Sequence, residues 1–390
     1  MYLVYLLLFI ALVGIVDVTY ERYFLDSATA FDAGLFPGNR EVAAAMKEAV
    51  FGTGGEVKRE APWSLYIVNY MYMIYVGSGI VFIVALAELF EIELLKKTAA
   101  GFLTIGLAMV LAGLFTILMD LNVLHLGAML LHPQPSSGMW LMAPLYMVYV
   151  PLVIFEIYLI LSHHESWVKK IALLILIVSL VVEVVEFYIQ AKLFDMNSAR
   201  HLWTTYPVLP LYFMISSFVA SLGIMILYAH LVYKNILLLY ILERAGLYFV
   251  MALGAYEATA YLFIDKKWAA IILFGEFKYY FYLYLVLAVG IPFALLFKHY
   301  LNAYLRTIAA VSMIIGTYIG KLVFVYGGNA YPLSDRFGVG FEKYSEYERV
   351  KDVIFFMPSL GEIAIVVGSI GIVLLVYKLS DLYFCVSKPL

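Results

Sequence analysis

The chain has 390 residues, of which 65% are hydrophobic and only 14% are charged, and its net charge is −3 at pH 7. Soluble domains are about half apolar and about a quarter charged. This composition therefore excludes a soluble enzyme, a disordered scaffold and a nucleic-acid-binding protein. The single cysteine, Cys385, excludes a disulfide framework and a cysteine-ligated iron–sulfur cluster within the chain. We therefore predict an integral membrane protein.

Uninterrupted apolar segments of about 20 residues recur along the chain, which is the length that an α-helix needs to cross a bilayer. Short segments of alternating hydrophobicity, which are typical of membrane β-barrels, do not occur. The predicted fold class is all-α, with about ten transmembrane helices. The expected spans, in chain order, are 2–19, 64–90, 98–119, 139–162, 168–190, 207–233, 238–263, 279–298, 303–326 and 354–378.

The first span is short and N-terminal, so a secretory signal peptide is the alternative interpretation. It has no basic start and no small-residue cleavage site, and the next residues are Tyr20-Glu21-Arg22-Tyr23. A signal peptide needs both features, so we expect an uncleaved first helix. Gln134 and Gln190 are the only glutamines, and this scarcity of thermolabile side chains is a weak indication of a thermophilic source.

The connections between the spans alternate in length. Those at 20–63, 120–138, 191–206, 264–278 and 327–353 are long, and with ten spans all of them fall on one membrane face. The short connections carry compact basic groups such as Lys96-Lys97 and Lys169-Lys170. Basic residues in short loops favour the cytoplasm, so we expect a multi-pass protein of the plasma membrane with external long loops and cytoplasmic short loops. The long-loop face suits the docking of a peripheral subunit.

A weak internal repeat divides the spans. Gly79-Ile80-Val81 follows Trp63 in the second span, as Gly223-Ile224-Met225 follows Trp203 in the sixth. Repeats of this kind are common in membrane proteins that build a site inside a bundle. We expect four parts: the first helix and a long loop (1–63), a first four-helix bundle (64–190), a second four-helix bundle (191–326), and a long loop with the last helix (327–390).

Carboxylates inside the spans are the first functional candidates, because ionisable groups are costly in a membrane. Glu183 and Glu186 lie three residues apart and so on one helix face. Two neighbouring carboxylates repel each other and a bound proton removes one of the two charges, so this pair is a candidate for holding a proton. The other candidates are Glu156 in the fourth span, Glu257 in the seventh and Glu362 in the tenth; Glu243-Arg244 lies near one end of the seventh. A buried structural pair is the alternative for each of these groups, and it is about equally favoured.

Tyr66, Asn69, Tyr70, Met73 and Gly77 fall on one helical stripe of the second span. The aromatic rings offer flat apolar walls and Asn69 offers a donor and an acceptor, a combination that suits a quinone. Helix packing is the alternative, since Gly77 permits close approach and Asn69 can bond across helices. From spacing alone, packing is favoured.

Metal and covalent chemistry are not expected in this chain. None of its seven histidines lies in the middle of a span, so paired axial ligands for a haem are not predicted. No Walker, G-x-S-x-G or H-E-x-x-H motif occurs. We therefore expect no metal site, no haem and no iron–sulfur cluster.

Four segments follow one another in an order typical of a known family. They are Ala61-Pro62-Trp63 through Asn69 to Gly77-Ser78-Gly79, then Met119-Asp120-Leu121 with His132-Pro133 and Ser136-Ser137-Gly138-Met139-Trp140, then Pro207 to Phe213, and finally Met357-Pro358-Ser359-Leu360-Gly361-Glu362. Together they resemble the polysulfide-reductase-type (NrfD-like) family of quinone-interacting membrane subunits, in its ten-span form. One departure is that Asn122-Val123-Leu124 stands where the family has Gly-Arg-Pro, so the arginine beside Asp120 is missing.

The resemblance implies a site for a menaquinone-type quinone at the end of the first bundle. Carried over by position, Asn69 and Tyr70 would lie in the wall with Tyr66, and Asp120 would lie at the mouth. The fourth span would contribute Tyr146 or Tyr149. Reduction of a quinone takes two electrons and two protons, so Glu156, Glu183 and Glu186 would relay protons.

The resemblance also implies a membrane anchor that exchanges electrons between a quinone and a ferredoxin-type iron–sulfur subunit. A molybdopterin catalytic subunit would act on sulfur compounds such as polysulfide, thiosulfate or tetrathionate, and the chain alone would be inactive. Alternatives are a subunit of a quinone-linked hydrogenase or sulfite-reductase-linked complex, a purely structural anchor, and a secondary transporter with intramembrane carboxylates. Transporters break their helices around the substrate, whereas interior prolines here, Pro151 and Pro292, are few.

Overall fold

The computed structural model describes residues 2–23, 63–162, 166–196, 201–264, 266–298, 302–330 and 358–389. In this part of the chain all regular structure is helical, and ten helices are long and apolar enough to cross a membrane. The predicted all-α membrane fold is confirmed. Most of two expected long loops, 24–62 and 331–357, lies outside the described residues, as does the expected start of the last span at 354–357.

The spanning helices are α1 (Tyr2–Tyr23), α4 (Leu65–Leu89), α6 (Ala99–Leu131), α7 (Gly138–Leu161), α8 (Ser166–Asp195), α10 (Leu209–Tyr228) with the π-helical η1 (Ala229–Tyr233), α11 (Ile236–Ala260), α13 (Lys278–Leu285) with η2 (Val286–Gly290) and α14 (Ile291–Leu296), α15 (Ala303–Asn329) and α16 (Leu360–Phe384). Three short helices, α5 (Glu93–Lys96), α9 (His201–Thr205) and α12 (Lys266–Leu273), lie in the connections.

The largest difference from the expected spans is at α6, which continues to Leu131 instead of ending at 119. Asp120 and Asn122 lower the local hydropathy, and this drop indicated a loop. The backbone nevertheless stays helical until Pro133 approaches, because proline disfavours the helical conformation in the residue before it. The end of a membrane-length apolar segment is therefore not the end of this helix.

Side-chain caps fix where several helices begin. Ser64, Ser137, Asn235, Asn302 and Ser359 each accept a hydrogen bond from a backbone N–H in the first turn of the following helix. Serine and asparagine are preferred at this position because they satisfy an N–H that has no partner inside the helix. These residues set the starts of α4, α7, α11, α15 and α16.

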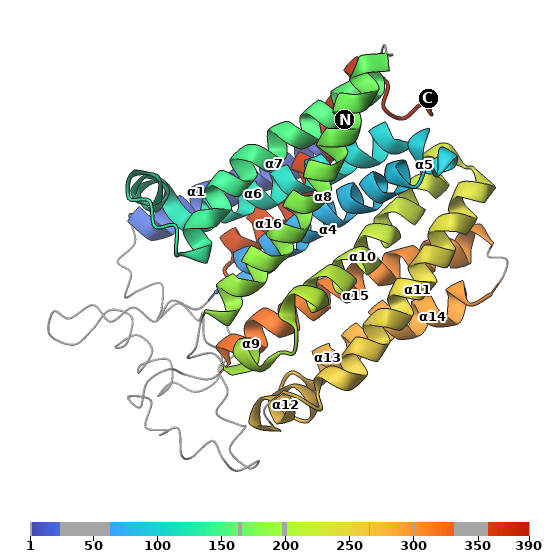
Figure 1. Cartoon of the computed structure of the whole chain (residues 1–390). Coiled ribbons are helices and arrows are strands. Elements are labelled where there is room, and N and C mark those ends of the chain that lie inside the picture. Colours follow the sequence, from blue (N-terminus) through green and yellow to red (C-terminus); the bar gives the residue numbers. More distant parts are fainter. Residues whose placement is uncertain are drawn as a thin grey trace, which may run out of the picture.

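The helices pack as two groups that meet at α4 (Figure 1). We call α4, α6, α7 and α8 the first helix group, and α10, α11, α13–α14 and α15 the second helix group; neighbours within each group contact one another. Helix α4 also packs on α10 and α15, so most of its surface is buried. The predicted domain boundaries stay a prediction, since these contacts join both groups into one bundle.

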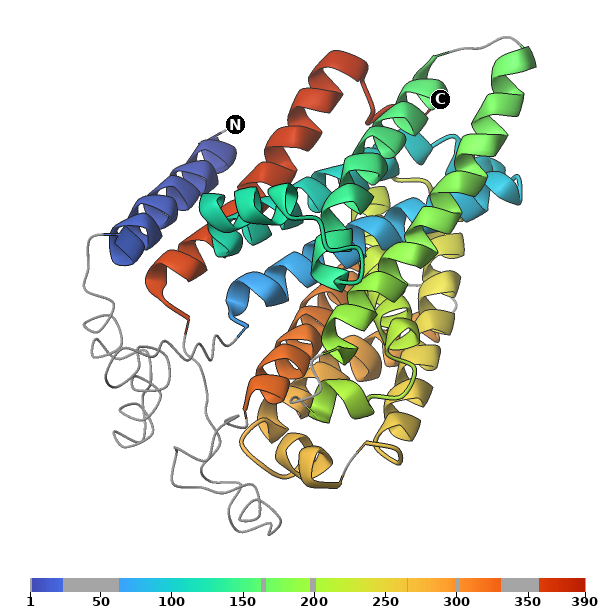
Figure 2. The same ribbon diagram turned by 60° about the vertical axis from the view of Figure 1, so that its left-hand side comes forward.

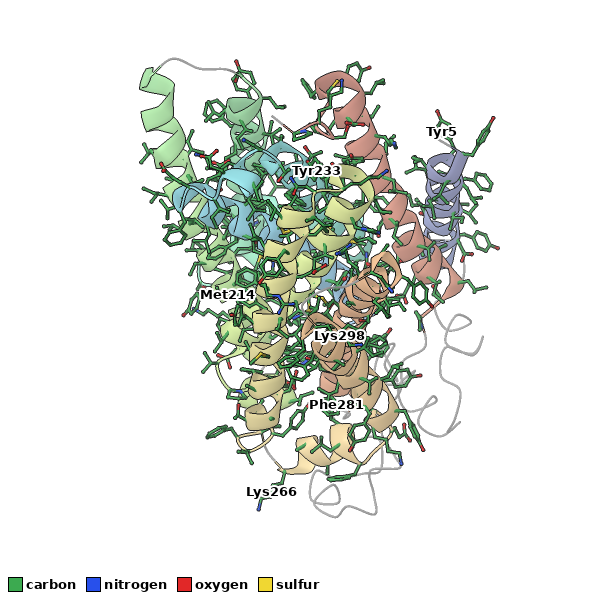
Figure 3. The ribbon with its side chains drawn as sticks, turned by 90° about the vertical axis from the view of Figure 1, so that its right-hand side faces the viewer. Tyr5, Met214, Tyr233, Lys266, Phe281 and Lys298 are labelled. Carbon is green, nitrogen blue, oxygen red and sulfur yellow. The ribbon has the colours of Figure 1, made fainter. Side chains whose placement is uncertain are left out.

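Helices α1 and α16 form an outer pair (Figure 2), and α16 packs in turn on α6. Glycines allow this close approach: a Cβ on Gly368 would lie 2.2 Å from the Cβ of Ala11. Small residues at such contacts are typical of membrane helices, whose association depends on close packing. The outer face of α1 carries exposed side chains such as Tyr5, which points away from the protein (Figure 3) and so toward lipid.

The two ends of the bundle carry different connections. Helices α9 and α12 lie at one end and α5 lies at the other (Figure 1). We call these the long-connection end and the short-connection end. Helix α4 begins at the long-connection end, where α6 and α8 finish, so Trp63, Asp120 and Gln190 come from the same half of the bundle.

Candidate functional site

A cavity of about 510 Å³ lies inside the first helix group, toward the long-connection end. Its walls come from Trp63 and from helices α4, α6, α7 and α8. The lining residues are Trp63, Ile67, Tyr70, Met71, Leu111, Leu114, Ile117, Leu118, Asp120, Leu121, Met139, Met142, Ala143, Tyr146, Met147, Val150, Pro151, Gln190, Leu193 and Phe194. Ligand cavities measure about 300–1,000 Å³, so this volume suits a small organic molecule.

Few polar side chains interrupt the apolar wall of this cavity. Tyr70, Asp120, Tyr146 and Gln190 bring hydroxyl, carboxyl and amide groups to it. The hydroxyls of Tyr70 and Tyr146 are neighbours. A mostly apolar cavity with a few polar groups on one wall is typical of a site for a flat apolar ring with polar substituents.

Tyr146 is held in place by two side chains of α8. Its hydroxyl donates to Oε1 of Glu186 (2.8 Å) and accepts a hydrogen bond from Nε2 of Gln190 (2.5 Å). Gln190 also donates to Oε1 of Glu186 (3.0 Å), and Ser78 of α4 donates to Oε2 (2.5 Å). Because donors occupy both oxygens of Glu186, the orientation of its carboxyl group is fixed. A molecule in the cavity is therefore in contact with the Tyr146 hydroxyl, which is hydrogen-bonded to the buried carboxyl group of Glu186.

A second carboxyl group lies next to the first. Glu183 is fully buried one turn before Glu186 on the same face of α8, and the Tyr149 hydroxyl of α7 donates to its Oε1. Its Oε2 has no hydrogen-bond partner among the described residues. The two glutamates that the helical spacing placed together are thus each bonded to a tyrosine of α7, although Tyr149 itself does not line the cavity.

Glu156 lies further along α7, toward the short-connection end. It is 7% exposed, and its Oε1 has no hydrogen-bond partner in the described part of the chain. Together with Glu88, near the end of α4, it lines a small cavity of about 30 Å³, which is room for a single water molecule. Ser179, buried one turn before Glu183 on α8, neighbours the Glu156 carboxyl group.

Aromatic rings close the long-connection end of the large cavity. Trp63 stacks on Trp203 (centroids 4.8 Å apart) and meets Phe194 edge-on (4.6 Å). The Trp203 Nε1 donates to the carbonyl oxygen of Phe324 (2.9 Å), and Nδ2 of Asn329 donates to the carbonyl oxygen of Trp63 (2.7 Å). The two tryptophans of the sequence repeat therefore meet, and they join the two helix groups beside the cavity.

Two residues expected in the wall lie elsewhere. Nδ2 of Asn69 donates to Oγ1 of Thr116 in α6 (2.9 Å) and to Oγ of Ser369 in α16 (3.1 Å), so Asn69 joins three helices and does not line the cavity. Tyr66 of α4 packs against residues of α1, α6 and α16. Successive helical residues point about 100° apart, so Asn69 does not share the direction of Tyr70.

The remaining two glutamates of the sequence prediction are also outside the cavity wall. Glu257 lies in the second helix group, where it accepts hydrogen bonds from the hydroxyls of Tyr284 (2.7 Å) and Tyr206 (3.4 Å). Glu362 lies in the first turn of α16, next to the Ser359 cap. The structure therefore brings Glu183 and Glu186 together, places Glu156 beyond them, and separates Glu257 and Glu362 from this set.

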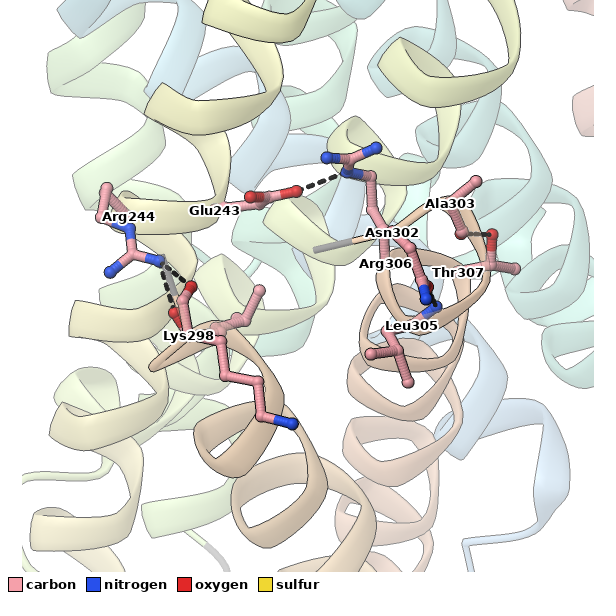
Figure 4. Close-up of polar contacts among 9 residues, drawn as sticks. Glu243, Arg244, Lys298, Asn302, Ala303, Leu305, Arg306 and Thr307 are labelled. Atoms are coloured by element: carbon pink, nitrogen blue, oxygen red, sulfur yellow. Dashed lines mark hydrogen bonds and ion pairs between the residues drawn. The ribbon is translucent and has the colours of Figure 1, made fainter. Parts of the chain in front are cut away.

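Glu243 is an example of the structural alternative. It is buried near the start of α11 and pairs with Nε of Arg306 in α15 at 2.5 Å (Figure 4). Its neighbour Arg244 donates to the carbonyl oxygens of Leu296 (2.5 Å) and Lys298 (2.8 Å). These contacts tie α11 to α14 and α15 at the short-connection end, as in the ion pairs that stabilise buried charges.

Sequence reasoning missed Gln190, Ser78, Glu88 and Lys321. Gln190 lies four residues after Glu186, so the spacing that singled out the glutamates also indicated it. Lys321 stands in an apolar stretch inside the ninth span, and the criterion applied to buried carboxylates would have found it. Ser78 and Glu88 gave no comparable signal, because a serine is common in such helices and Glu88 lies at a span end.

A family model described as "Polysulphide reductase, NrfD" matches residues 55–332, which is more than half of the chain and includes every residue of the large cavity. No curated protein matches the chain.

Proposed function

Since the chain belongs to the NrfD polysulphide reductase family, we propose that its large cavity is the quinone site of a respiratory oxidoreductase complex. Subunits of this family lie in the membrane, interact with quinones and associate with catalytic and iron–sulfur subunits. The observation that carries the proposal is the cavity in the first helix group, with its hydroxyl and amide groups bonded to Glu186.

The residues around the cavity fit a quinone in size and in chemistry. A quinone ring needs apolar walls, and its two carbonyl oxygens need hydrogen-bond donors. Tyr70 and Tyr146 bring hydroxyl groups to the cavity. We assign Tyr70 as a donor to one carbonyl oxygen and Asp120 as a residue of the mouth. Tyr146 becomes a second donor when Glu186 is protonated and donates to the Tyr146 oxygen, while Gln190 holds the pair in position.

A bound quinone supplies the exchange of two electrons and two protons, and the side chains around it hold and move the protons. Tyr146 passes a proton between the cavity and Oε1 of Glu186, to which its hydroxyl already donates. Gln190 keeps the two groups in position through its hydrogen bonds to both. A general acid or base must lie within hydrogen-bond distance of the group that it serves, and this pair meets that condition.

The other carboxyl groups extend this route toward the short-connection end. Along the proposed proton route, Glu183 is the next carboxyl group after Glu186. Ser179 then leads to Glu156 on α7. A water molecule in the 30 Å³ cavity would join Glu156 to Glu88. We infer that protons are exchanged with the membrane face at the short-connection end, which the basic short loops predict to be cytoplasmic.

Electrons enter or leave at the opposite end in this proposal. The cavity lies toward the long-connection end, so a ferredoxin-type iron–sulfur subunit would dock there, with a molybdopterin subunit beyond it that acts on polysulfide, thiosulfate or tetrathionate. We further propose that the quinone is of the menaquinone type. The protein would lie in the plasma membrane with its long-connection end on the external side.

The test uses the assembled complex and two matched tyrosine variants. Tyr146→Phe removes a hydroxyl from the cavity wall, whereas Tyr72→Phe removes a buried hydroxyl of α4 that donates to the carbonyl oxygen of Ile314 (2.9 Å) outside it. We expect Tyr146→Phe to lower kcat/KM for a quinone analogue by about tenfold or more, because it loses a ligand and a proton donor. Tyr72→Phe should stay within about twofold of the natural protein. Equal kcat/KM for Tyr146→Phe and the natural protein, in a complex that retains the chain, would contradict the proposed site.

A further inference from the structure

Lys321 is a buried lysine of the second helix group that the proposed quinone site does not use. It lies in α15 and is 2% exposed. Its Nζ donates to Oγ of Ser216 in α10 (2.7 Å), and it forms no ion pair in the described part of the chain. An ammonium group has three N–H donors, so burying it in a membrane with one acceptor is costly unless other groups stabilise it.

Three aromatic rings supply that stabilisation. The Nζ of Lys321 lies 4.5 Å from the ring centroids of Tyr212 and Phe213 and 5.1 Å from that of Tyr75. The face of an aromatic ring attracts a cation, most strongly where water is excluded. The three rings therefore offset part of the cost of burying the positive charge of Lys321, without a carboxylate in direct contact.

A buried carboxyl group lies near enough to interact electrostatically with this lysine. Glu257 of α11 is 3% exposed, and Tyr284, which donates to its Oε1 (2.7 Å), packs against Gly320, the residue before Lys321. Its two oxygens accept hydrogen bonds from Tyr284 and Tyr206. Tyr212 links both groups, since its ring contacts Lys321 and its hydroxyl neighbours Tyr284.

We propose that Glu257 and Lys321 form a second proton-binding site, separate from the quinone site, whose ligand is a single exchangeable proton. In the unloaded state the Glu257 carboxylate compensates the ammonium charge of Lys321. On loading, a proton taken from water binds a carboxylate oxygen of Glu257 and forms a carboxylic acid, while Lys321 keeps its own proton. The aromatic rings make the loaded state possible, because they stabilise the ammonium group when the carboxylate charge is gone.

Tyr75 of α4 connects this site with the carboxyl groups of the first helix group. It is fully buried, and its hydroxyl has no hydrogen-bond partner among the described residues. Its ring stacks on Phe187 (centroids 5.4 Å apart), the residue after Glu186. Tyr75 thus lies next to Lys321 and near Glu186, and we expect a change of charge on Glu186 to act on Lys321 through this contact. This coupling rests on the proposed function, whereas the proton-binding site itself does not.

Infrared difference spectroscopy of the complete complex between two pH values tests the site without quinone turnover. Glu257→Gln should remove one carboxyl band from the spectrum. Lys321→Met should shift the pH range of that band by about one unit or more, because the nearby charge is lost. Lys321→Arg retains the charge and should keep the band, and Lys278→Met removes a lysine outside the site and should leave the spectrum unchanged.

Two results would overturn the proposal: a Glu257→Gln spectrum that keeps every carboxyl band, and a Lys321→Met spectrum with the band at its original pH range. If Lys321→Met does not assemble, the Glu257→Gln spectrum decides. No quinone enters these measurements. A failure of this site is therefore distinguishable from a failure of the quinone site, which the kinetics of Tyr146→Phe report.

Discussion

Asn69 and Tyr70 show how two adjacent residues of one helix take different tasks. Asn69 bonds to α6 and α16, whereas Tyr70 lines the cavity. Both are buried, so burial alone does not distinguish them. The direction of each side chain does, and it is set by how α4 is rotated against its neighbours.

Asn69→Leu is therefore expected to lower stability and leave quinone kinetics intact. The change removes two hydrogen bonds between helices, each worth about 0.6 kcal/mol in membrane proteins. We expect the free energy of unfolding to fall by about 1 kcal/mol, measured as a lower thermal midpoint in detergent. The kcat/KM for a quinone analogue should stay within about twofold. A large loss of kcat/KM at an unchanged thermal midpoint would instead place Asn69 in the site.

At the scale of elements, the eighth span is α13, η2 and α14 in place of one regular helix. Pro292 follows the π-helical η2, and a proline removes one hydrogen bond of a regular helix, which a π-helical turn accommodates. The main chain of η2 lies against α15: a Cβ on Gly316 would be 2.3 Å from the backbone nitrogen of Ala288. Gly316 thus provides the space in which the irregular span packs.

Gly316→Ala is expected to destabilise the second helix group. Its added methyl group meets backbone atoms that cannot move aside, and such overpacking costs about 1–3 kcal/mol. Gly290→Ala is the matched control, since the nearest atom to its Cβ would be 3.7 Å away. Thermal unfolding of the purified protein compares the midpoints of the two variants. Equal midpoints would contradict a tight contact between α15 and η2 at Gly316.

At the scale of the whole molecule, polar groups follow one another through the first helix group from one end to the other. Tyr146 and Glu186 lie beside the large cavity, Glu183 follows, and Glu156 and Glu88 share the small cavity near the opposite end. The quinone site and the proton entrance of the proposed function therefore face different sides of the membrane. In the proposed function, a reaction arranged in this way would move charge across the bilayer.

Glu156→Gln in the assembled complex tests this route. A glutamine amide does not bind and release a proton near neutral pH, as a carboxyl group does. We therefore expect kcat at saturating quinone to fall by about tenfold or more while KM stays unchanged. Glu93→Gln changes an exposed carboxylate at the same end, paired with Lys96 on the surface, and should leave kcat within about twofold. A Glu156→Gln complex that turns over at the rate of the natural protein would exclude Glu156 from the route.

Much of the fold and part of the candidate site were predictable because they depend on local features of the sequence. A membrane span needs a run of apolar residues of sufficient length, and this is visible without any contact. The pairing of Glu183 with Glu186 on one face follows from the helical repeat itself. The start of the second span after Ser64 follows in the same way from local capping chemistry, whereas α16 begins at Leu360 and not at the expected residue 354.

The sequence by itself thus determined the class of protein, the spans and the buried carboxyl groups. Only the tertiary structure decided which side chains meet: Tyr146 with Glu186, Asn69 with Ser369, and Lys321 with Tyr75. The physical reason is that lipid and protein interior are equally apolar, so the hydrophobic pattern of a membrane helix does not mark its inward face. The rotation of each helix is set instead by close packing at glycines and by hydrogen bonds between helices, and these exist only in the folded bundle.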